Sequence, residues 1–219
     1  MPRTARLVVP GIPHHVTQRG NRCQQTFFGP EDYARYLRLL RFWCGKAGTQ
    51  IWAWCLMPNH VHLILVPETP KGLAETLAPV HRRYTWAINQ REGWRGFLWQ
   101  SRFGSAPMDE AHLHACFRYV ELNPVRAGLV ERPEQWRWSS ARAHLGLAAD
   151  PLTVVAPGHE RIGDWRALLD SGLSDGERAA IRVGERTGRP LGGPAFVDRL
   201  SAVVGRPLRP APARRLGHT

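Results

Sequence analysis

The pattern of hydrophobic and polar positions predicts strands and helices in the order β, α, β, β, α, β, α. Apolar and polar residues alternate around Val16, and two further strand patterns run over residues 50–56 and 61–66, separated by a turn at residues 57–59. Extended segments are also expected at residues 97–100 and 103–108. Apolar residues at helical spacing predict helices over residues 30–44, 73–88 and 110–122.

This order predicts an α+β fold with a ferredoxin-like antiparallel sheet and helices on one face of that sheet. A composition change near Ala149-Asp150-Pro151 places a domain boundary there, so we expect a first domain over residues 1–148 and a mostly helical extension over residues 149–219. Within the extension, Ser174 and Glu177 form a capping-box signal for a helix that runs to about Arg186. Residues 194–204 can form another helix, and the proline-rich basic tail that follows is expected to be disordered.

Composition points to a polyanionic partner. The chain has 219 residues, a formal net charge of +12 and a sequence pI of about 10.8, a balance suited to nucleic acid, whose counterions are released on binding. Its four cysteines contain no C-x-x-C pair, which argues against a zinc module and against a disulfide framework. No apolar run approaches the length of a membrane span, so we expect a soluble cytoplasmic protein associated with the nucleoid.

The sharpest local feature is the pair His60-Val61-His62 at the start of an apolar strand. Strand alternation puts both imidazoles on one face, about 6.6 Å apart along the strand. Neutral imidazoles placed in this way can converge on a divalent cation. The spacing alone is more typical of a pair of half-buried sheet histidines, and His14 and His15 compete with the pair for a place near a site.

A second feature is Tyr119 with Asn123, four residues apart in FRYVELNP. This spacing sets both side chains on one helical face. An amide oxygen can be a metal ligand and a phenol can be a phosphate nucleophile, although each residue alone is more typical of packing or capping.

Five segments, in order, resemble the REP-associated tyrosine transposases, single-tyrosine HUH endonucleases of the IS200-like transposase superfamily. They are PHHVTQRGN at 13–21, MPNHVHLILV at 57–66, WQSRF at 99–103, YVELNPVRAGLV at 119–130 and WSSARAHLG at 138–146. Together they span most of residues 7–146, and five ordered segments are more specific than any one of them.

The resemblance implies a function and a set of site residues. It assigns the nucleophile to Tyr119 and the ligands of Mg²⁺ or Mn²⁺ to His60, His62 and Asn123. It implies nicking and rejoining of single-stranded DNA through a 5′-phosphotyrosine, and it implies that the partners are DNA hairpins of the repetitive extragenic palindrome type. We expect a monomer rather than a homodimer.

DNA contacts are expected from basic and polar residues near the first strand, on the second helix and in WQSRF. The candidates are Arg19, Asn21, Arg22, Arg82, Arg83 and Arg102. A solvated surface role fits each of them as well.

Two other functions compete. A noncatalytic hairpin-binding or repressor protein would keep the fold and the charge, but the intact set of Tyr119, His60 and His62 argues against a decayed site. A zinc hydrolase of small substrates is disfavoured by the absence of an H-E-x-x-H motif and by the basic charge.

Overall fold

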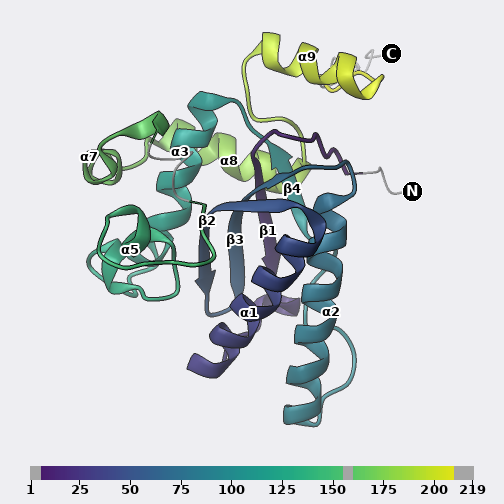
Figure 1. The fold of residues 1–219 in the computed structure, drawn as a ribbon, viewed down its shortest axis with the longest axis vertical. Coiled ribbons are helices and arrows are strands. Elements are labelled where there is room, and N and C mark those ends of the chain that lie inside the picture. The colour runs from purple at the N-terminus through teal and green to yellow at the C-terminus, as the bar shows by residue number, and fades with distance from the viewer. Residues whose placement is uncertain (1–5, 155–159, 210–219) are drawn as a thin grey trace, which may run out of the picture.

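A four-stranded antiparallel sheet lies at the centre of the protein, shown in Figure 1 as a computed structural model in which residues 6–154 and 160–209 are described. The strand order is β2-β3-β1-β4, and every neighbouring pair is antiparallel. The strands are β1 (His14–Arg19), β2 (Thr49–Met57), β3 (His60–Pro67) and β4 (Gly104–Pro107). The predicted α+β class and ferredoxin-like sheet are therefore confirmed. Residues 97–100, expected to be extended, contribute only an isolated bridge between Trp99 and Gly20.

Helices α1 (Pro30–Ala47) and α2 (Gly72–Glu92) cover one face of the sheet, which we call the aromatic face. Alternation along β3 points Val61, Leu63 and Leu65 toward these helices. Aromatic rings dominate this half of the core: the Phe27 ring stacks on Tyr33 at 4.5 Å and meets Tyr84 at 5.3 Å. The helical tyrosines 33, 36 and 84 are thus packing residues, as their spacing predicted.

The opposite face, which we call the histidine face, is covered by α3 (Glu110–Glu121), α7 (Trp165–Asp170) and α8 (Asp175–Thr187). Ile64 and Val66 of β3 point this way and pack in one cluster with Cys116 of α3 and Ile181 of α8. The expectation that the helices lie on one face is therefore wrong for these three. The physical reason is that the central strands are apolar on both sides, so each side needs a cover.

The described residues also form several further helical elements. They are η1 (Asn21–Cys23), α4 (Asn123–Arg126), η2 (Pro133–Gln135), α5 (Ala141–His144) and α9 (Pro194–Val204). Helix α9 packs on the N-terminal segment, where Phe196 and Leu200 meet Leu7 and Val9. The predicted disordered tail falls mainly on residues 210–219, outside the described residues. Among the helices that the structure describes, none has the length and hydropathy needed to cross a bilayer.

The predicted capping box opens α8 as expected: the Ser174 hydroxyl accepts from the Glu177 backbone N–H, and the Glu177 carboxylate accepts from Ser174. An Arg118–Glu177 ion pair ties this helix to α3. Gly184 lets α8 pack closely against Leu191, because a Cβ at position 184 would lie only 2.7 Å from the buried Leu191 side chain. The C-terminal extension therefore shares the hydrophobic core of the sheet.

Candidate active site

A cavity of about 540 Å³ opens on the histidine face, where β1, β3, α3, α4 and α8 meet. Its lining brings together side chains that lie far apart in the sequence: Thr17, Gln18, Arg19, His60, His62, Gln100, Tyr119, Asn123, Arg126, Ala127, Arg182, Glu185 and Arg186. The four residues proposed for chemistry from the sequence all belong to this set. The fold thus brings together His60, His62, Tyr119 and Asn123.

The histidine pair points into this cavity from the start of β3. The rings of His60 and His62 lie edge to face with centroids 4.9 Å apart, on the same face as alternation predicted. Burial, with the charge of Arg19, lowers the pKa of His60 to about 4. Burial together with neighbouring His60 and His15 holds the pKa of His62 well below its ordinary value. Both rings are therefore neutral at pH 7, the form that binds metal ions.

Of the two N-terminal histidines, only His15 lies beside the His60–His62 pair. His15 on β1 lies beside His62 on β3, with its Nε2 3.1 Å from His62 Nδ1 and the two rings stacked. His14 points the other way, where its Nδ1 meets the Ile12 carbonyl at 2.7 Å and its Nε2 accepts from the Val9 N–H. His15 therefore belongs to the site, whereas His14 holds the N-terminal segment.

Tyr119 projects from the last turn of α3 toward the histidines, with ring centroids 5.4 Å from His62 and 5.7 Å from His15. Burial and the Glu185 carboxylate raise the pKa of the Tyr119 phenol. Two cations oppose that shift: Arg126, whose guanidinium lies 4.4 Å from the ring centroid, and Arg182, which hydrogen-bonds the phenol. The Tyr119 phenol thus lies between two arginines and one carboxylate, which act on its pKa in opposite directions.

Asn123 lines the same cavity as Tyr119, but the two residues do not belong to one continuous helix. Helix α3 ends at Glu121, and its C-cap Leu122, with φ of −84° and ψ of 2°, separates it from α4, which begins at Asn123. Arg126 crosses this break by donating to the Tyr119 carbonyl at 2.8 Å. The side chains of Tyr119 and Asn123 still line one cavity, as their four-residue spacing predicted.

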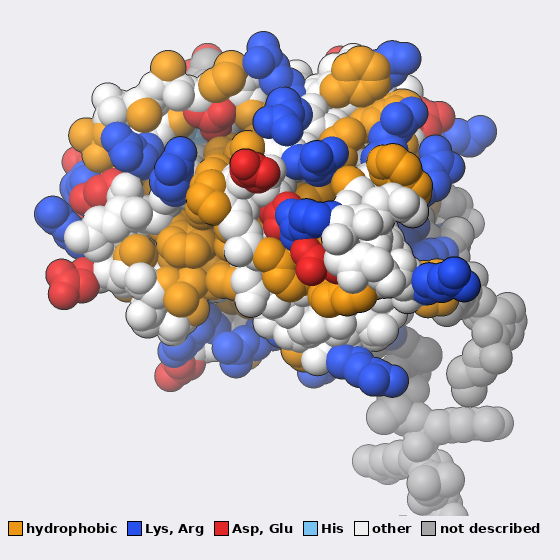
Figure 2. Space-filling model, turned by 90° about the horizontal axis from the view of Figure 1, so that it is seen from below, with side chains coloured by type: hydrophobic (Ala, Val, Ile, Leu, Met, Phe, Trp, Pro, Cys, Tyr) orange, Lys and Arg blue, Asp and Glu red, His pale blue; other side chains and the backbone are white. Residues whose placement is uncertain are grey.

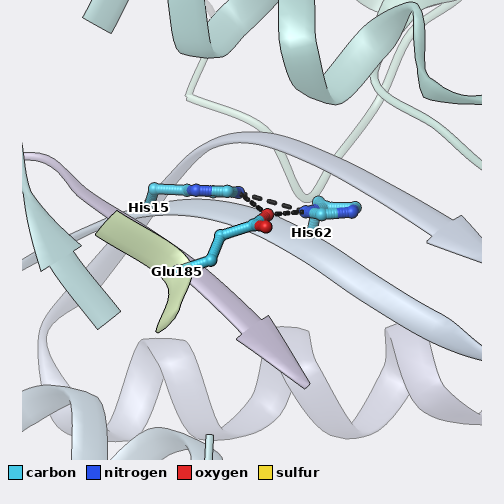
Figure 3. A group of neighbouring side chains, drawn as sticks. All are labelled: His15, His62 and Glu185. Carbon is cyan, nitrogen blue, oxygen red and sulfur yellow. Dashed lines mark hydrogen bonds and ion pairs between the residues drawn. The ribbon is translucent and has the colours of Figure 1, made fainter. Parts of the chain in front are cut away.

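Glu185 enters from α8, in the extension. Its Oε1 lies 3.6 Å from His62 Nδ1 and 3.9 Å from His15 Nε2 (Figure 3). Burial raises the pKa of this carboxyl, while its contact with the Tyr119 hydroxyl and nearby arginines acts in the opposite direction. Its Oε1 is buried and has no hydrogen-bond donor among the described residues.

These donors fit a divalent cation. Neutral imidazoles, an amide and a carboxylate converge on one buried place, and the unpaired Glu185 oxygen is a group that a cation would satisfy. The sequence alone had no signal for Glu185, because its position depends on how α8 packs. Arg126, seven residues after Tyr119, could have been found from helical spacing.

The candidate DNA contacts are distributed over both faces. Arg19 lines the site cavity, and it also lines an adjoining cavity of about 670 Å³ together with Arg102. Asn21 and Arg22 lie in the η1 turn and line neither cavity. Arg82 and Arg83 are exposed on α2, which covers the aromatic face. The position of α2 therefore separates these two arginines from the candidate site.

Net charge by itself does not locate a DNA interface. On the face shown in Figure 2, Lys and Arg side chains are spread widely, with acidic side chains among them. The two adjoining cavities locate an interface better than net charge does, because arginines line both of them. The cavities are continuous in their lining and share six residues: Thr17, Gln18, Arg19, Gln100, Glu185 and Arg186.

An α+β fold with an antiparallel sheet, in which a histidine pair faces a helical tyrosine, is typical of a class of DNA-processing proteins. The family model described as "Transposase IS200 like" matches residues 9–123, and the chain belongs to this family. It is 24% identical over 104 residues to the REP-associated tyrosine transposase of Escherichia coli, covering 47% of this chain and 61% of that protein. It is 28% identical over 97 residues to a protein provisionally given the same name in Haemophilus influenzae, covering 39% of this chain and 55% of that protein.

A solved structure of a REP-associated tyrosine transposase bound to a REP hairpin shares the fold, with a TM-score of 0.57 and 18% sequence identity. The match covers 70% of this chain and 97% of that one. These findings confirm the resemblance that the five sequence segments predicted. The chain spans only 61% and 55% of the length of the curated relatives that it matches.

Proposed function

We propose that this protein nicks single-stranded DNA beside a hairpin and rejoins it through a covalent phosphotyrosine, with a divalent cation as cofactor. The observation that carries the proposal is the convergence of Tyr119, His60, His62 and Asn123 on one arginine-lined cavity. The IS200-like family and the hairpin-bound relative support a transposase chemistry on hairpin DNA.

In the proposed reaction, Tyr119 Oη attacks the scissile phosphorus in line with the 3′ oxygen. The Oη–P bond forms and the P–O3′ bond breaks, so the products are a 5′-phosphotyrosine and a free 3′-hydroxyl. The phenol proton is lost to a neighbouring base or water, and the leaving 3′ oxygen takes up a proton. A phosphodiester is conserved throughout, so attack by another 3′-hydroxyl reverses the step and joins strands without an external energy source.

The chain's own residues provide binding and orientation. Arg126 and Arg182 lie beside Tyr119 and favour its phenolate, the reactive form. His60, His62 and Asn123 would hold the cation. A divalent cation bound there would polarise the scissile phosphate and orient it for attack.

The adjoining cavity gives the strand a path to the site. Its lining includes Arg6, Arg19, Arg102, Arg186 and Arg189, which suit phosphate contacts along an unpaired strand. Gln100 borders both cavities, is exposed and can hydrogen-bond base edges.

The test is a covalent-adduct assay with single-stranded hairpin oligonucleotides of the repetitive palindrome type, each carrying a 5′ flank, in Mn²⁺. Wild-type protein should give an adduct that survives denaturation and maps to Tyr119. Tyr119→Phe should give none while still binding the hairpin, and the matched control Tyr84→Phe should give the wild-type amount. Hairpin binding without any adduct in wild-type protein would favour a noncatalytic binding protein instead.

A further inference from the structure

The His60–His62 pair does not describe every donor at the site: His62 on β3 and Glu185 on α8, which line the cavity, lie close to His15 on β1 (Figure 3). We propose that these three side chains ligate the divalent cation directly, so that the C-terminal helix α8 completes the metal site. The inference deepens the proposed function and rests on it.

The distances among the three donor atoms carry the argument. Donors that are each about 2.1 Å from one ion lie about 3.0 Å apart at adjacent octahedral positions and about 3.4 Å apart in a tetrahedron. His15 Nε2 and His62 Nδ1 are 3.1 Å apart, and Glu185 Oε1 is 3.6 Å and 3.9 Å from His62 and His15. Small side-chain movements would therefore place all three around one ion.

The surroundings explain why an ion is needed there. His15 and His62 are buried, at 2% and 4% exposed, and the Glu185 oxygen between them has no hydrogen-bond donor among the described residues. A buried carboxylate oxygen without a partner is costly, and direct ligation by a cation removes that cost. The charges of Arg126 and Arg182 lower the pKa values of Tyr119 and Glu185, but neither arginine donates a hydrogen bond to Glu185 Oε1.

Two features of the backbone hold the donors in place. The β1–β3 register pairs Thr17 with His62, which puts His15 and His62 diagonally across two neighbouring strands on one face. Gly184 permits the close packing of α8 on Leu191 that brings Glu185 over these strands.

The chemistry of the set predicts which ions bind. Imidazole nitrogens combined with a carboxylate oxygen form a mixed donor set that suits Mn²⁺, Fe²⁺, Co²⁺ or Zn²⁺. Mg²⁺ prefers an all-oxygen shell, so we expect Mn²⁺ to bind more tightly than Mg²⁺.

Isothermal titration of the full chain with Mn²⁺ tests the inference without DNA. Wild-type protein should bind one ion, and Glu185→Gln should weaken the affinity by at least about tenfold. Asp175→Asn makes the same charge change on the same helix at an exposed position and should bind Mn²⁺ like wild-type protein. Far-UV circular dichroism and the metal-free melting temperature verify that each variant folds.

Pulsed electron paramagnetic resonance of bound Mn²⁺ gives a second readout, because it counts the coupled imidazole nitrogens. His15→Gln should remove one coupled imidazole from the wild-type count. Unchanged affinity in Glu185→Gln or an unchanged count in His15→Gln would overturn the inference, and so would a wild-type protein that binds no Mn²⁺. The proposed function fails separately if Mn²⁺ binds through Glu185 and yet no covalent adduct forms on hairpin DNA.

Discussion

The two faces of the sheet use similar residue types for opposite purposes. On the aromatic face, Tyr36 and Tyr84 are fully buried, and burial raises the pKa of each phenol well above its ordinary value. On the histidine face, burial also raises the pKa of Tyr119, but Arg126 and Arg182 oppose the shift and the ring borders a cavity. A tyrosine is therefore a candidate nucleophile because of the charges and space around it, and its residue type alone decides little.

One pair of polar groups shows the same contrast, although the buried indole N–H groups of Trp43 and Trp99 on the aromatic face also lack a hydrogen-bond partner among the described residues. On the aromatic face, the Tyr84 hydroxyl donates a hydrogen bond to the Thr26 carbonyl at 2.7 Å. The histidine face carries Glu185 with an unpaired oxygen beside two neutral imidazoles. Groups with satisfied hydrogen bonds stabilise the fold, whereas the unsatisfied group points to a ligand.

The largest expected effect is on the aromatic face. Phe27→Ala removes a ring that contacts Tyr33, Tyr36, Tyr84 and Trp99, and should lower the free energy of unfolding by about 4 kcal/mol. Urea denaturation followed by circular dichroism measures the change. A loss below about 1 kcal/mol would show that this cluster is less tightly packed than the distances indicate.

The second largest effect is expected from removing a buried carboxylate on the histidine face. The Glu121 carboxylate is fully buried, lies 2.5 Å from His144 Nδ1 and accepts from Ser140 and from Trp165, which joins α3 to α5 and α7. Glu121→Ala strips these contacts and should cost about 3 kcal/mol of stability. Thermal denaturation measures it, and exposed Glu131→Ala on the same protein should change the melting temperature little.

A smaller effect is expected from one hydroxyl on the aromatic face. Tyr84→Phe removes the hydrogen bond to the Thr26 carbonyl and should cost about 1 kcal/mol of stability. The covalent adduct should form in the wild-type amount, because Tyr84 points from α2 into the aromatic core and lines neither cavity. Loss of the adduct in a folded Tyr84→Phe protein would break the division of roles between the two faces.

The smallest effect is a pH dependence on the aromatic face. Burial lowers the pKa of His81, which lies 3.0 Å from the Tyr36 hydroxyl, to about 3. The unfolded chain therefore takes up the proton first, and stability is lost as pH falls from about 6.5 toward 3. His81→Gln should lessen the fall in stability between pH 7 and pH 6 by at most about 1 kcal/mol. Melting temperatures of both proteins at the two pH values measure this, and equal falls would contradict it.

The sequence by itself determined the periodic elements and the local pairs. Alternation placed His60 and His62 on one face, and helical spacing placed Tyr119 beside Asn123, because both relations depend only on backbone geometry within one element. Element order was sufficient for the antiparallel sheet, since short connections restrict the possible topologies. The same reasoning did not show that α3, α7 and α8 cover the second face, because strands that are apolar on both sides do not specify which helix covers which side.

Only the tertiary structure decided which distant residues meet. It chose His15 over His14, because the β1–β3 register and the strand faces are set by pairing across the sheet. It brought Glu185 to the histidines because α8 packs on the same hydrophobic core through Ile181 and Gly184. It also separated Arg82 and Arg83 from the site by the thickness of the sheet. Contacts between elements depend on packing that no local sequence pattern encodes, and the proposed metal triad is made of such contacts.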